Sequence, residues 1–468
     1  NMPLILPGNV GSATAATGYD VANSVRFNRG DAAYMHKTPG SAGNVDVWTF
    51  SAWIKISDEG TARNIFAQKG GDGTSQRAYI LLGSGNTLSV SQYTGSALDF
   101  SLVANRLFRD QGAWYHIIIA VDTGQGTDTN RIKMYVNGVQ ETSFSTATYP
   151  SQNLDTYVNA ADQPMAVGYD PKVSSRHFGG YMAEVVLIDG TQYANTDFGE
   201  FDEDSGIWKP IDVSGLTFGT NGFYLDFEAS ANLGNDANGG TDLTEVNLAA
   251  VDQATDTCTN NFATMNPLDN FYAAHPFAEG NTKVSTSTST TSFSTATIGL
   301  STGKWYFEGT VRAVMGEEGI GVSPLVSTAA DDYPGKATDS VSYKGNNGNV
   351  RKSNSNAAYG NAYVNNNVIG VLLNLDDNEI KFSLNGTVQN SGTAVALTAA
   401  ASTPNGVYFP MVGDGSTDSV GVWEVNFGAG SFTALSSAVA DENGFGAFEY
   451  APPSGFLAIC TKNLAESG

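Results

Sequence analysis

The chain has 468 residues, too many for a single hydrophobic core, so two domains of about 150–250 residues each are expected. Charged residues make up only 15% of it, below the roughly 25% of an average domain. The 47 Asp and Glu against 23 Lys and Arg give a net charge of -24. This acidity disfavours duplex nucleic acid and anionic membrane surfaces as partners, because proteins recognise both with basic clusters.

The composition favours strands. The chain has 53 Gly and is rich in Ser, Thr and Asn, residues that suit strands, turns and loops better than helix interiors. No long stretch keeps a 3.6-residue periodicity, and no apolar run approaches the length of a membrane-spanning helix. The N-terminal segment lacks a basic region and is interrupted by Pro7 and Gly8, so we expect neither a signal peptide nor a membrane anchor there.

The first half carries clear strand signals. Residues 48–56 (WTFSAWIKI) and 114–121 (WYHIIIAV) have the aromatic and β-branched composition of strands. The second run has no polar face, which predicts a buried strand. Residues 132–136 then alternate in character and end at Asn137-Gly138, the pattern of a β-hairpin.

The second half repeats this order. Residues 368–375 (VIGVLLNL) predict a buried strand, an acidic turn follows, and residues 380–384 alternate up to Asn385-Gly386. The low-complexity run at 285–297 (STSTSTTSFSTAT) is expected to form an edge strand, because threonine suits strands and Phe293 supplies an apolar anchor. Two β-sandwiches of similar topology in tandem account for the repetition.

Two families resemble these halves. TFSAWIKI, WYHIIIAVD with IKMYVNGV, and GGYMAEVVLIDG resemble the laminin-G-like, concanavalin-like jelly roll. GKWYFE at 303–308, GIGV at 319–322, IGVLLNLDDNEIKFSLNG, YFP at 408–410 and VNFG at 425–428 resemble a SPRY domain, which is itself a concanavalin-like sandwich.

The predicted fold class is therefore all-β, with two tandem concanavalin-like antiparallel β-sandwiches and an extended N-terminal arm. The expected domains are an N-terminal docking arm, a laminin-G-like sandwich, a connector, a SPRY-like sandwich and an extended C-terminal tail, at residues 1–18, 19–228, 229–280, 281–440 and 441–468.

Segments outside the sandwiches resemble virion proteins of tailed bacteriophages. They are MPLILPGNVGSATAATGYDVANSVRFN at the start, GFYLDF at 222–227, NFATMNPL at 261–268 and PPSGF at 452–456. Such proteins are usually labelled tail fibre or structural, so the resemblance implies a fibre or receptor-binding function.

The sequence offers no catalytic array. Concanavalin-like glucanases place several carboxylates at alternating positions of one strand, and Asp226 with Glu228 supplies only part of that pattern. His116 lies within a predicted buried strand, where a hydrogen-bonded core imidazole is expected. We therefore expect no enzyme, and a carbohydrate-active enzyme stays open as an alternative.

Calcium is a second open alternative. Laminin-G-like domains often hold one Ca²⁺ at a sandwich rim with carboxylates and carbonyls. Asp122 and Asp128 flank the turn TGQGT and could supply two oxygens, although solvated turn residues are the simpler explanation. No other cofactor is expected.

Ligand-binding residues are expected in end loops, where rigid aromatics lie among small polar residues. The candidates are tyrosines in turn-like sequence, each of which could instead cap the edge of a core: Tyr149, Tyr157, Tyr333, Tyr343, Tyr359 and Tyr363.

The resulting functional hypothesis is a structural virion protein of a tailed phage, located in the virion and most simply a tail fibre or receptor-binding component. A capsid-decorating or head-fibre protein is the main alternative. Expected partners are sister subunits in a homotrimer, other virion proteins, and a host-surface glycan or protein, with no membrane insertion. The apolar residues Leu4, Ile5 and Leu6 are expected to dock the N-terminal arm on the virion or on sister subunits.

Overall fold

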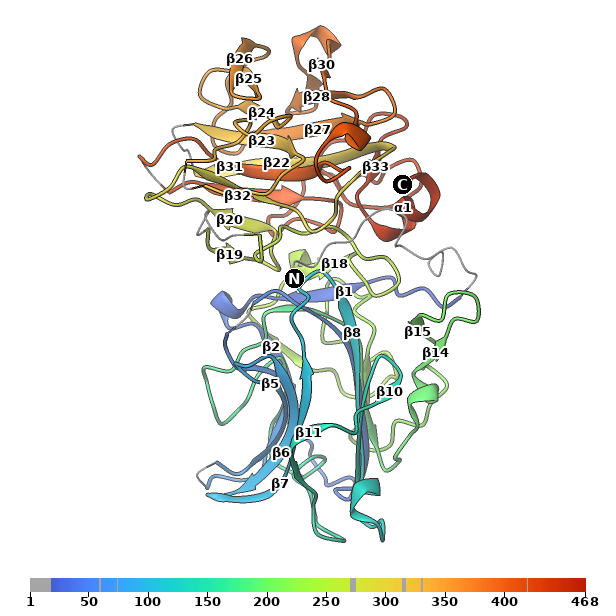
Figure 1. Ribbon diagram of the computed structural model, residues 1–468. Helices are drawn as coiled ribbons and strands as arrows, with labels where there is room; N and C mark the ends of the chain where they lie inside the picture. Colours follow the sequence, from blue (N-terminus) through green and yellow to red (C-terminus); the bar gives the residue numbers. More distant parts are fainter. Residues whose placement is uncertain are drawn as a thin grey trace. The chain divides into compact units, whose positions relative to one another are not determined.

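The computed structural model describes residues 18–58, 60–73, 75–269, 275–313, 317–329, 331–418 and 420–468. The described residues fall into two compact units that divide between Thr259 and Asn260. Antiparallel strands dominate both units (Figure 1), and the described residues contain one α-helix. The predicted all-β fold of antiparallel sandwiches is confirmed, whereas the predicted N-terminal arm, with Leu4, Ile5 and Leu6, lies outside the described residues.

The first unit contains two large sheets. In the order of pairing, one consists of β10 (Val139–Gln140), β9 (Ile132–Val136), β8 (Trp114–Asp122), β3 (Val47–Ile56), β13 (Gly180–Asp189), β1 (Ser24–Phe27) and β18 (Gln253–Ala254), with β16 (Phe223–Leu225) beside β13. The other consists of β11 (Phe144–Thr148), β7 (Ala97–Leu107), β6 (Thr87–Thr94), β5 (Arg77–Leu82), β4 (Arg63–Lys69), β12 (Met165–Val167), β2 (Tyr34–Lys37) and β17 (Thr244–Val246).

Shorter elements complete this unit. They are the hairpin of β14 (Gly199–Phe201) and β15 (Trp208–Pro210) and the 3₁₀ turns η2 (Arg29–Asp31), η3 (Asp128–Asn130), η4 (Asn195–Asp197) and η5 (Ala250–Asp252).

The core of the first unit lies between the two sheets. Strand β3 is buried from Trp48 onward because it pairs on one side with β8 and on the other with β13. The predicted hairpin is present: Asn137 and Gly138 take φ values of 48° and 76° and join β9 to β10. Both residues have positive φ, as a two-residue hairpin turn requires.

Part of the segment expected to be a connector belongs to the first sandwich. Strand β17 pairs with β2, and β18 pairs with β1. The sequence at 229–259 is rich in Asn, Asp and Gly, which favour loops. The two short strands form here because each extends an edge of a sheet that is already in place, which demands little strand propensity of its own.

The second unit also contains two sheets. In the order of pairing, one consists of β19 (Phe277–Ala278), β20 (Lys283–Ser285), β32 (Val422–Asn426), β22 (Lys304–Ala313), β27 (Val368–Asn374), β28 (Glu379–Leu384) and β29 (Thr387–Val388), with β30 (Val395–Ala396) beside β28 and β33 (Leu457–Ala458) beside β22. The other consists of β21 (Ser292–Thr295), β31 (Phe409–Asp414), β23 (Glu318–Ser323), β24 (Val341–Lys344), β25 (Asn349–Lys352) and β26 (Ser355–Ala358).

The predicted elements of the second half are also present. Strands β27 and β28 match the two predicted strands, and Asn385 and Gly386 turn the chain into β29 with φ values of 47° and 77°. Strand β21 lies at the edge of its sheet, as the Ser/Thr-rich run predicts.

The C-terminal residues form more than an extended tail. Strand β33 runs parallel to β22, and the last element is helix α1 (Thr461–Ser467). Two short 3₁₀ turns, η6 (Asn390–Gly392) and η7 (Ala400–Ser402), lie earlier in this unit. Leu464 is buried in the core of the second unit, so this apolar residue explains why the segment folds back. Among the described residues, no helix has the length and apolar character needed to cross a bilayer.

Candidate functional site

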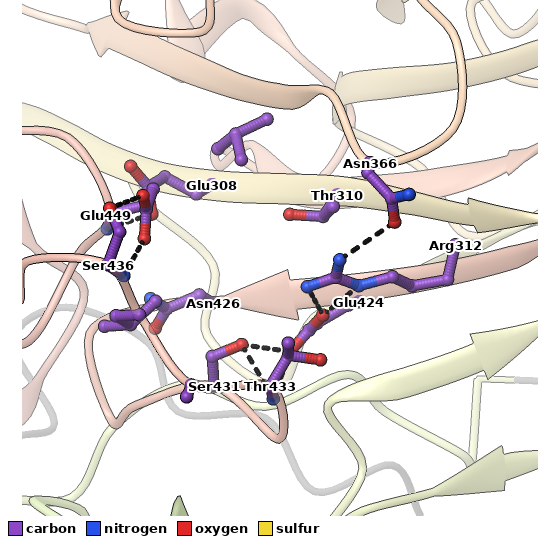
Figure 2. A pocket seen from close by; sticks show the side chains of 13 residues that line it. Glu308, Thr310, Arg312, Asn366, Glu424, Asn426, Ser431, Thr433, Ser436 and Glu449 are labelled. Atoms are coloured by element: carbon purple, nitrogen blue, oxygen red, sulfur yellow. Dashed lines mark hydrogen bonds and ion pairs between the residues drawn. The ribbon is translucent and has the colours of Figure 1, made fainter.

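A polar pocket of about 220 Å³ lies on the second sandwich, on the face of β22 and β32 that points away from the core. Figure 2 shows the side chains from both strands that line it, with Ser431, Thr433 and Ser436 of the segment that follows β32 beside them. Its lining residues are Glu308, Thr310, Arg312, Asn366, Val368, Glu424, Asn426, Ser431, Thr433, Ala434, Leu435, Ser436 and Glu449.

Strand alternation explains why the floor of the pocket is polar. On β22, Phe307 and Val311 belong to the hydrophobic core, so the residues that alternate with them in the strand face the other way. That opposite face carries Glu308, Thr310 and Arg312. On β32 the same alternation buries Trp423 and Val425 and turns Glu424 and Asn426 into the pocket.

An ion pair fixes one side of the floor. Arg312 Nε donates to Glu424 Oε2 at 2.5 Å, and Arg312 Nη1 donates to Asn366 Oδ1 at 3.1 Å. The other carboxylate oxygen of Glu424 accepts from the backbone N–H of Thr433 at 3.0 Å and from the Ser431 hydroxyl. The guanidinium is thus held in one orientation beside the amide of Asn366.

A buried carboxyl defines the other side. Glu308 is 2% exposed and accepts from the Tyr306 hydroxyl at 2.9 Å and from the backbone N–H groups of Glu449 and Tyr450 at 2.8 and 2.9 Å. Burial raises the pKa of Glu308 to about 7, although these three hydrogen bonds act in the opposite direction. This carboxyl is therefore partly protonated near neutral pH.

The segment that covers the pocket is attached by its own hydrogen bonds. Ser436 N donates to Glu449 Oε2 at 2.8 Å, and the Ser436 hydroxyl donates to the same carboxylate. Asn426 Nδ2 donates to Ala447 O at 2.7 Å. With three glutamates and one arginine among its lining residues, the pocket offers mainly acceptors, and it suits ligand hydroxyl or ammonium groups.

The sequence did not single out the pocket residues. The alternation in KWYFEGTVRA shows that Glu308, Thr310 and Arg312 share one face, which is the signal that could have found them. The residues that turn this face into a pocket come from 431–449, far along the chain.

Three of the predicted ligand-binding tyrosines are core residues instead. Tyr343, Tyr359 and Tyr363 are 0%, 8% and 2% exposed and pack on one another, with ring centroids 5.7 Å apart for Tyr343–Tyr359 and 5.3 Å for Tyr343–Tyr363. The Tyr363 hydroxyl donates to Tyr343 O at 3.0 Å. Buried rings offer no surface to a ligand, and this corrects the expectation for these three residues.

The other three tyrosines are partly exposed. The Tyr333 hydroxyl donates to Asn354 Oδ1 at 2.8 Å, and the Arg351 guanidinium lies 4.3 Å from the Tyr333 ring centroid. Tyr149 and Tyr157 pack against the core of the first sandwich at its edge. The six candidates thus do not form one site.

A second, more open pocket of about 430 Å³ lies on the second sandwich. It is lined by Thr291, Glu317, Asn346, Gly415, Ser416, Thr417 and Asp418. We treat the first pocket as the candidate site because a covering segment and an ion pair fix its geometry.

The two aspartates considered for calcium use their oxygens within their own turns. Asp122 accepts from Gly124 N at 3.0 Å and from the Gln125 side-chain amide. Asp128 accepts from Thr129 N at 2.7 Å. In the part of the chain that the structure describes, no three His, Cys, Asp or Glu side chains are grouped to hold a metal ion.

Comparisons with known proteins agree with the domain content. Residues 29–192 match the family described as the concanavalin A-like lectin/glucanases superfamily, and residues 304–427 match the SPRY domain. The chain therefore carries a laminin-G-like, concanavalin-like domain followed by a SPRY domain. No curated protein matches the chain.

Solved structures of low sequence identity resemble parts of the chain. A proposed carbohydrate binding protein from Bacteroides ovatus ATCC 8483 is 16% identical, with 48% of this chain and 58% of that chain covered and a TM-score of 0.34. The native heptameric SAP-like pentraxin from Limulus polyphemus is 14% identical over 38% and 81%, with a TM-score of 0.29. The SPRY domain of human HERC1 is 14% identical over 31% and 87%, with a TM-score of 0.23. The chain thus spans little more than half of the Bacteroides protein.

Proposed function

We propose that this chain is a non-catalytic binding protein of a tailed-phage virion, a tail-fibre or receptor-binding component that attaches to the host surface. The observation that carries the binding part is the polar pocket over β22 and β32. The phage part is supported by the resemblance of the segments outside the sandwiches, such as residues 261–268 and 452–456. Homotrimeric assembly and contacts with other virion proteins belong to the same proposal.

The chemistry of the pocket favours a hydroxyl-rich ligand, such as one sugar unit of a host-surface glycan. A volume of about 220 Å³ is below the roughly 300–1,000 Å³ of sites for drug-sized molecules. Acceptors on Glu449 and donors on Arg312 and Asn366 line the pocket, and hydrogen bonds from Ser436 and between Arg312 and Asn366 hold them in place. Fixed polar groups of this kind give orientation and specificity.

The geometry argues against the enzymatic alternative. A glycosidase needs one carboxyl to donate a proton and another to act as nucleophile or base. Both oxygens of Glu308 are already engaged by protein donors, and Glu424 is paired with Arg312. In the first sandwich, Asp226 Oδ1 accepts from Glu228 N, so that pair is arranged as a turn.

Filling the pocket tests the binding proposal. Ala434 lines the pocket and is exposed, so Ala434→Trp should place an indole in it without disturbing the core. The matched control is Ala438→Trp, the same substitution at an exposed alanine of the same segment that does not line the pocket.

Labelled full-length chain is applied to an array of bacterial surface polysaccharides. We expect Ala434→Trp to lose at least tenfold in binding while Ala438→Trp retains it. Equal binding by both variants would refute the pocket as the binding site.

The location of the chain needs a separate experiment. Antibody-gold labelling of purified phage particles that contain the chain should mark the tail tip or fibres. Labelling of the head would favour the capsid-decorating or head-fibre alternative.

A further inference from the structure

A lysine and an aspartate with fully buried side chains contact each other in the first sandwich. Lys55, the penultimate residue of β3, places Nζ 2.7 Å from Oδ2 of Asp256. The two side chains are 1% and 0% exposed. The pair is therefore closed to bulk water on every side.

Aromatic side chains enclose the lysine. Trp114 on β8 and Tyr181 on β13 are the cross-strand neighbours of Lys55 on its two sides. Neighbours at the same register point to the same face of a sheet, and Lys55 Nζ lies 5.8 Å from the centroid of the Tyr181 ring. Both rings belong to one hydrophobic cluster that also includes Trp53.

The aspartate is held in a fixed orientation. Trp114 Nε1 donates to Asp256 Oδ1 at 3.0 Å, and the Ser24 hydroxyl donates to Asp256 O at 2.6 Å. One carboxylate oxygen thus faces an N–H donor while the other faces the amine. This is the arrangement that acyl transfer to the amine needs, because the donor sits where negative charge develops on the oxygen that stays.

We infer that Lys55 and Asp256 condense into an intramolecular isopeptide bond that crosslinks β3 to the segment after β18. The reaction forms a bond between Lys55 Nζ and Asp256 Cγ and breaks the bond between Cγ and Oδ2. Two of the three ammonium protons leave with Oδ2 as one water molecule, and the third stays on the amide nitrogen. Atoms and charges balance without an oxidant, a cofactor or a second substrate.

Three physical effects favour this step. The amine and the carboxyl are fixed in contact, so condensation is unimolecular, and well-oriented groups of this kind react at effective concentrations far above those in solution. The amide replaces two buried charges, each of which is costly to keep out of water. The excluded water also prevents the reverse hydrolysis.

A further carboxyl is coupled to the lysine. Burial raises the pKa of Asp110, and the charge of Lys55 lowers it. Asp110 is fixed by Gly112 N, which donates to its Oδ1 at 2.8 Å.

Intact-mass spectrometry of the denatured full-length protein tests the inference. We expect a mass lower than that of the sequence by one water molecule, together with a crosslinked peptide pair that contains Lys55 and Asp256. A full-length protein with the unmodified mass and no such pair would overturn the inference, whatever the behaviour of the variants.

Variants locate the lost water. Asp256→Ala and Lys55→Arg should both restore the unmodified mass, and Asp256→Asn should lose ammonia instead of water because its amide becomes the leaving group. The matched control is Asp252→Ala, since Asp252 pairs with Arg26 at 3.0 Å in the same region and should keep the one-water deficit when changed. A deficit that persists in Lys55→Arg places the dehydration elsewhere and overturns the inference. None of these readouts depends on the proposed binding function.

Discussion

The two sandwiches neutralise buried carboxyl groups in different ways. In the first sandwich, the buried carboxylate of Asp170 has basic partners: its side chain is 0% exposed and lies 3.0 Å from Nε of Arg77 and 3.4 Å from Nη1 of Arg176. These interactions replace solvent with a fixed opposite charge.

In the second sandwich, Glu424 pairs with Arg312, but another buried pair consists of two carboxyls. Glu318 on β23 and Asp414 on β31 are direct cross-strand neighbours, and each is 1% exposed. Among the described residues, Glu318 Oε2 and Asp414 Oδ2 have no hydrogen-bond partner. The nearby cations pair with Glu317 instead, Lys344 at 3.3 Å and Arg351 at 2.6 Å.

The difference shows that a buried acid can be neutralised by a proton as well as by a cation. Burial, together with neighbouring carboxylates, raises the pKa of Glu318 to about 7 and that of Asp414 to about 6. Burial likewise raises the pKa values of Asp269 and Glu308 to about 7. The second sandwich should therefore respond to pH more strongly than the first.

Acidification should stabilise the second sandwich relative to the first. A carboxyl whose folded pKa is raised contributes stability below its unfolded pKa of about 4, and this is lost as pH rises through about 7. His275 acts in the opposite sense, because burial lowers its pKa to about 4 and stability is lost as pH falls below about 6.5. Because these four carboxyls outweigh the one histidine, the free energy of unfolding of the second sandwich should rise by on the order of 5 kcal/mol from pH 8 to pH 5.

The first sandwich should change less over this range. There the raised pKa of Glu184, about 7, is opposed by the lowered pKa of His116, about 3, both caused by burial. At Asp58 and Asp170, burial raises the pKa of the carboxyl, and nearby guanidinium groups lower it. Thermal unfolding of the full chain at pH 5 and pH 8, with hydrogen exchange to assign each transition, measures the difference. If the unfolding temperatures of both sandwiches shifted equally between pH 5 and pH 8, the predicted difference in pH response would be wrong.

Removing an acid from an ion pair should be costly in the first sandwich. Asp170→Ala leaves the buried guanidinium of Arg77 without this partner, which costs about 3–5 kcal/mol. Urea unfolding followed by hydrogen exchange should locate the loss in the first sandwich. Asp72→Ala is the control, because the side chain of Asp72 is exposed where it pairs with Lys69, and it should leave the midpoint unchanged.

Removing a charge should have the opposite effect in the second sandwich. Glu318→Gln eliminates the repulsion with Asp414 and should raise stability at pH 8 by about 2 kcal/mol, with little gain at pH 5, where the carboxyl is already protonated. The adjacent variant Glu317→Gln loses its contacts with Lys344 and Arg351 and should destabilise at pH 8. If both variants changed the stability at pH 8 in the same direction, repulsion between Glu318 and Asp414 would not explain the effect.

The strands of both sandwiches were predictable because their signals are local. The alternation at 132–136 and the Asn-Gly turns at 137–138 and 385–386 depend only on neighbouring residues. The environment of Tyr343 and Tyr363 was not predictable from turn-like sequence. Tyr343 lies in β24, between β23 and β25, and Tyr363 is buried against it. Local sequence also cannot show that the outer face of β22 is covered.

The smallest expected effect concerns a neutral hydrogen bond in the second sandwich. The Tyr363 hydroxyl is buried and donates to Tyr343 O at 3.0 Å, with Glu318 O at 3.3 Å as a second acceptor. Tyr363→Phe keeps the ring against Trp423 and removes only this donor, so it should cost about 1 kcal/mol.

That cost is smaller than the loss at Asp170 because no charge is left unpaired when Tyr363 is changed. Tyr333→Phe is the matched control: its hydroxyl contacts the exposed Asn354, where water can replace the lost donor, and no change in the unfolding midpoint is expected. Unfolding by urea at pH 8 compares the two variants. A loss at Tyr363→Phe as large as that of Asp170→Ala would mean that the second sandwich depends on its buried hydrogen bonds as strongly as the first depends on its ion pairs, and the contrast between the two would fail.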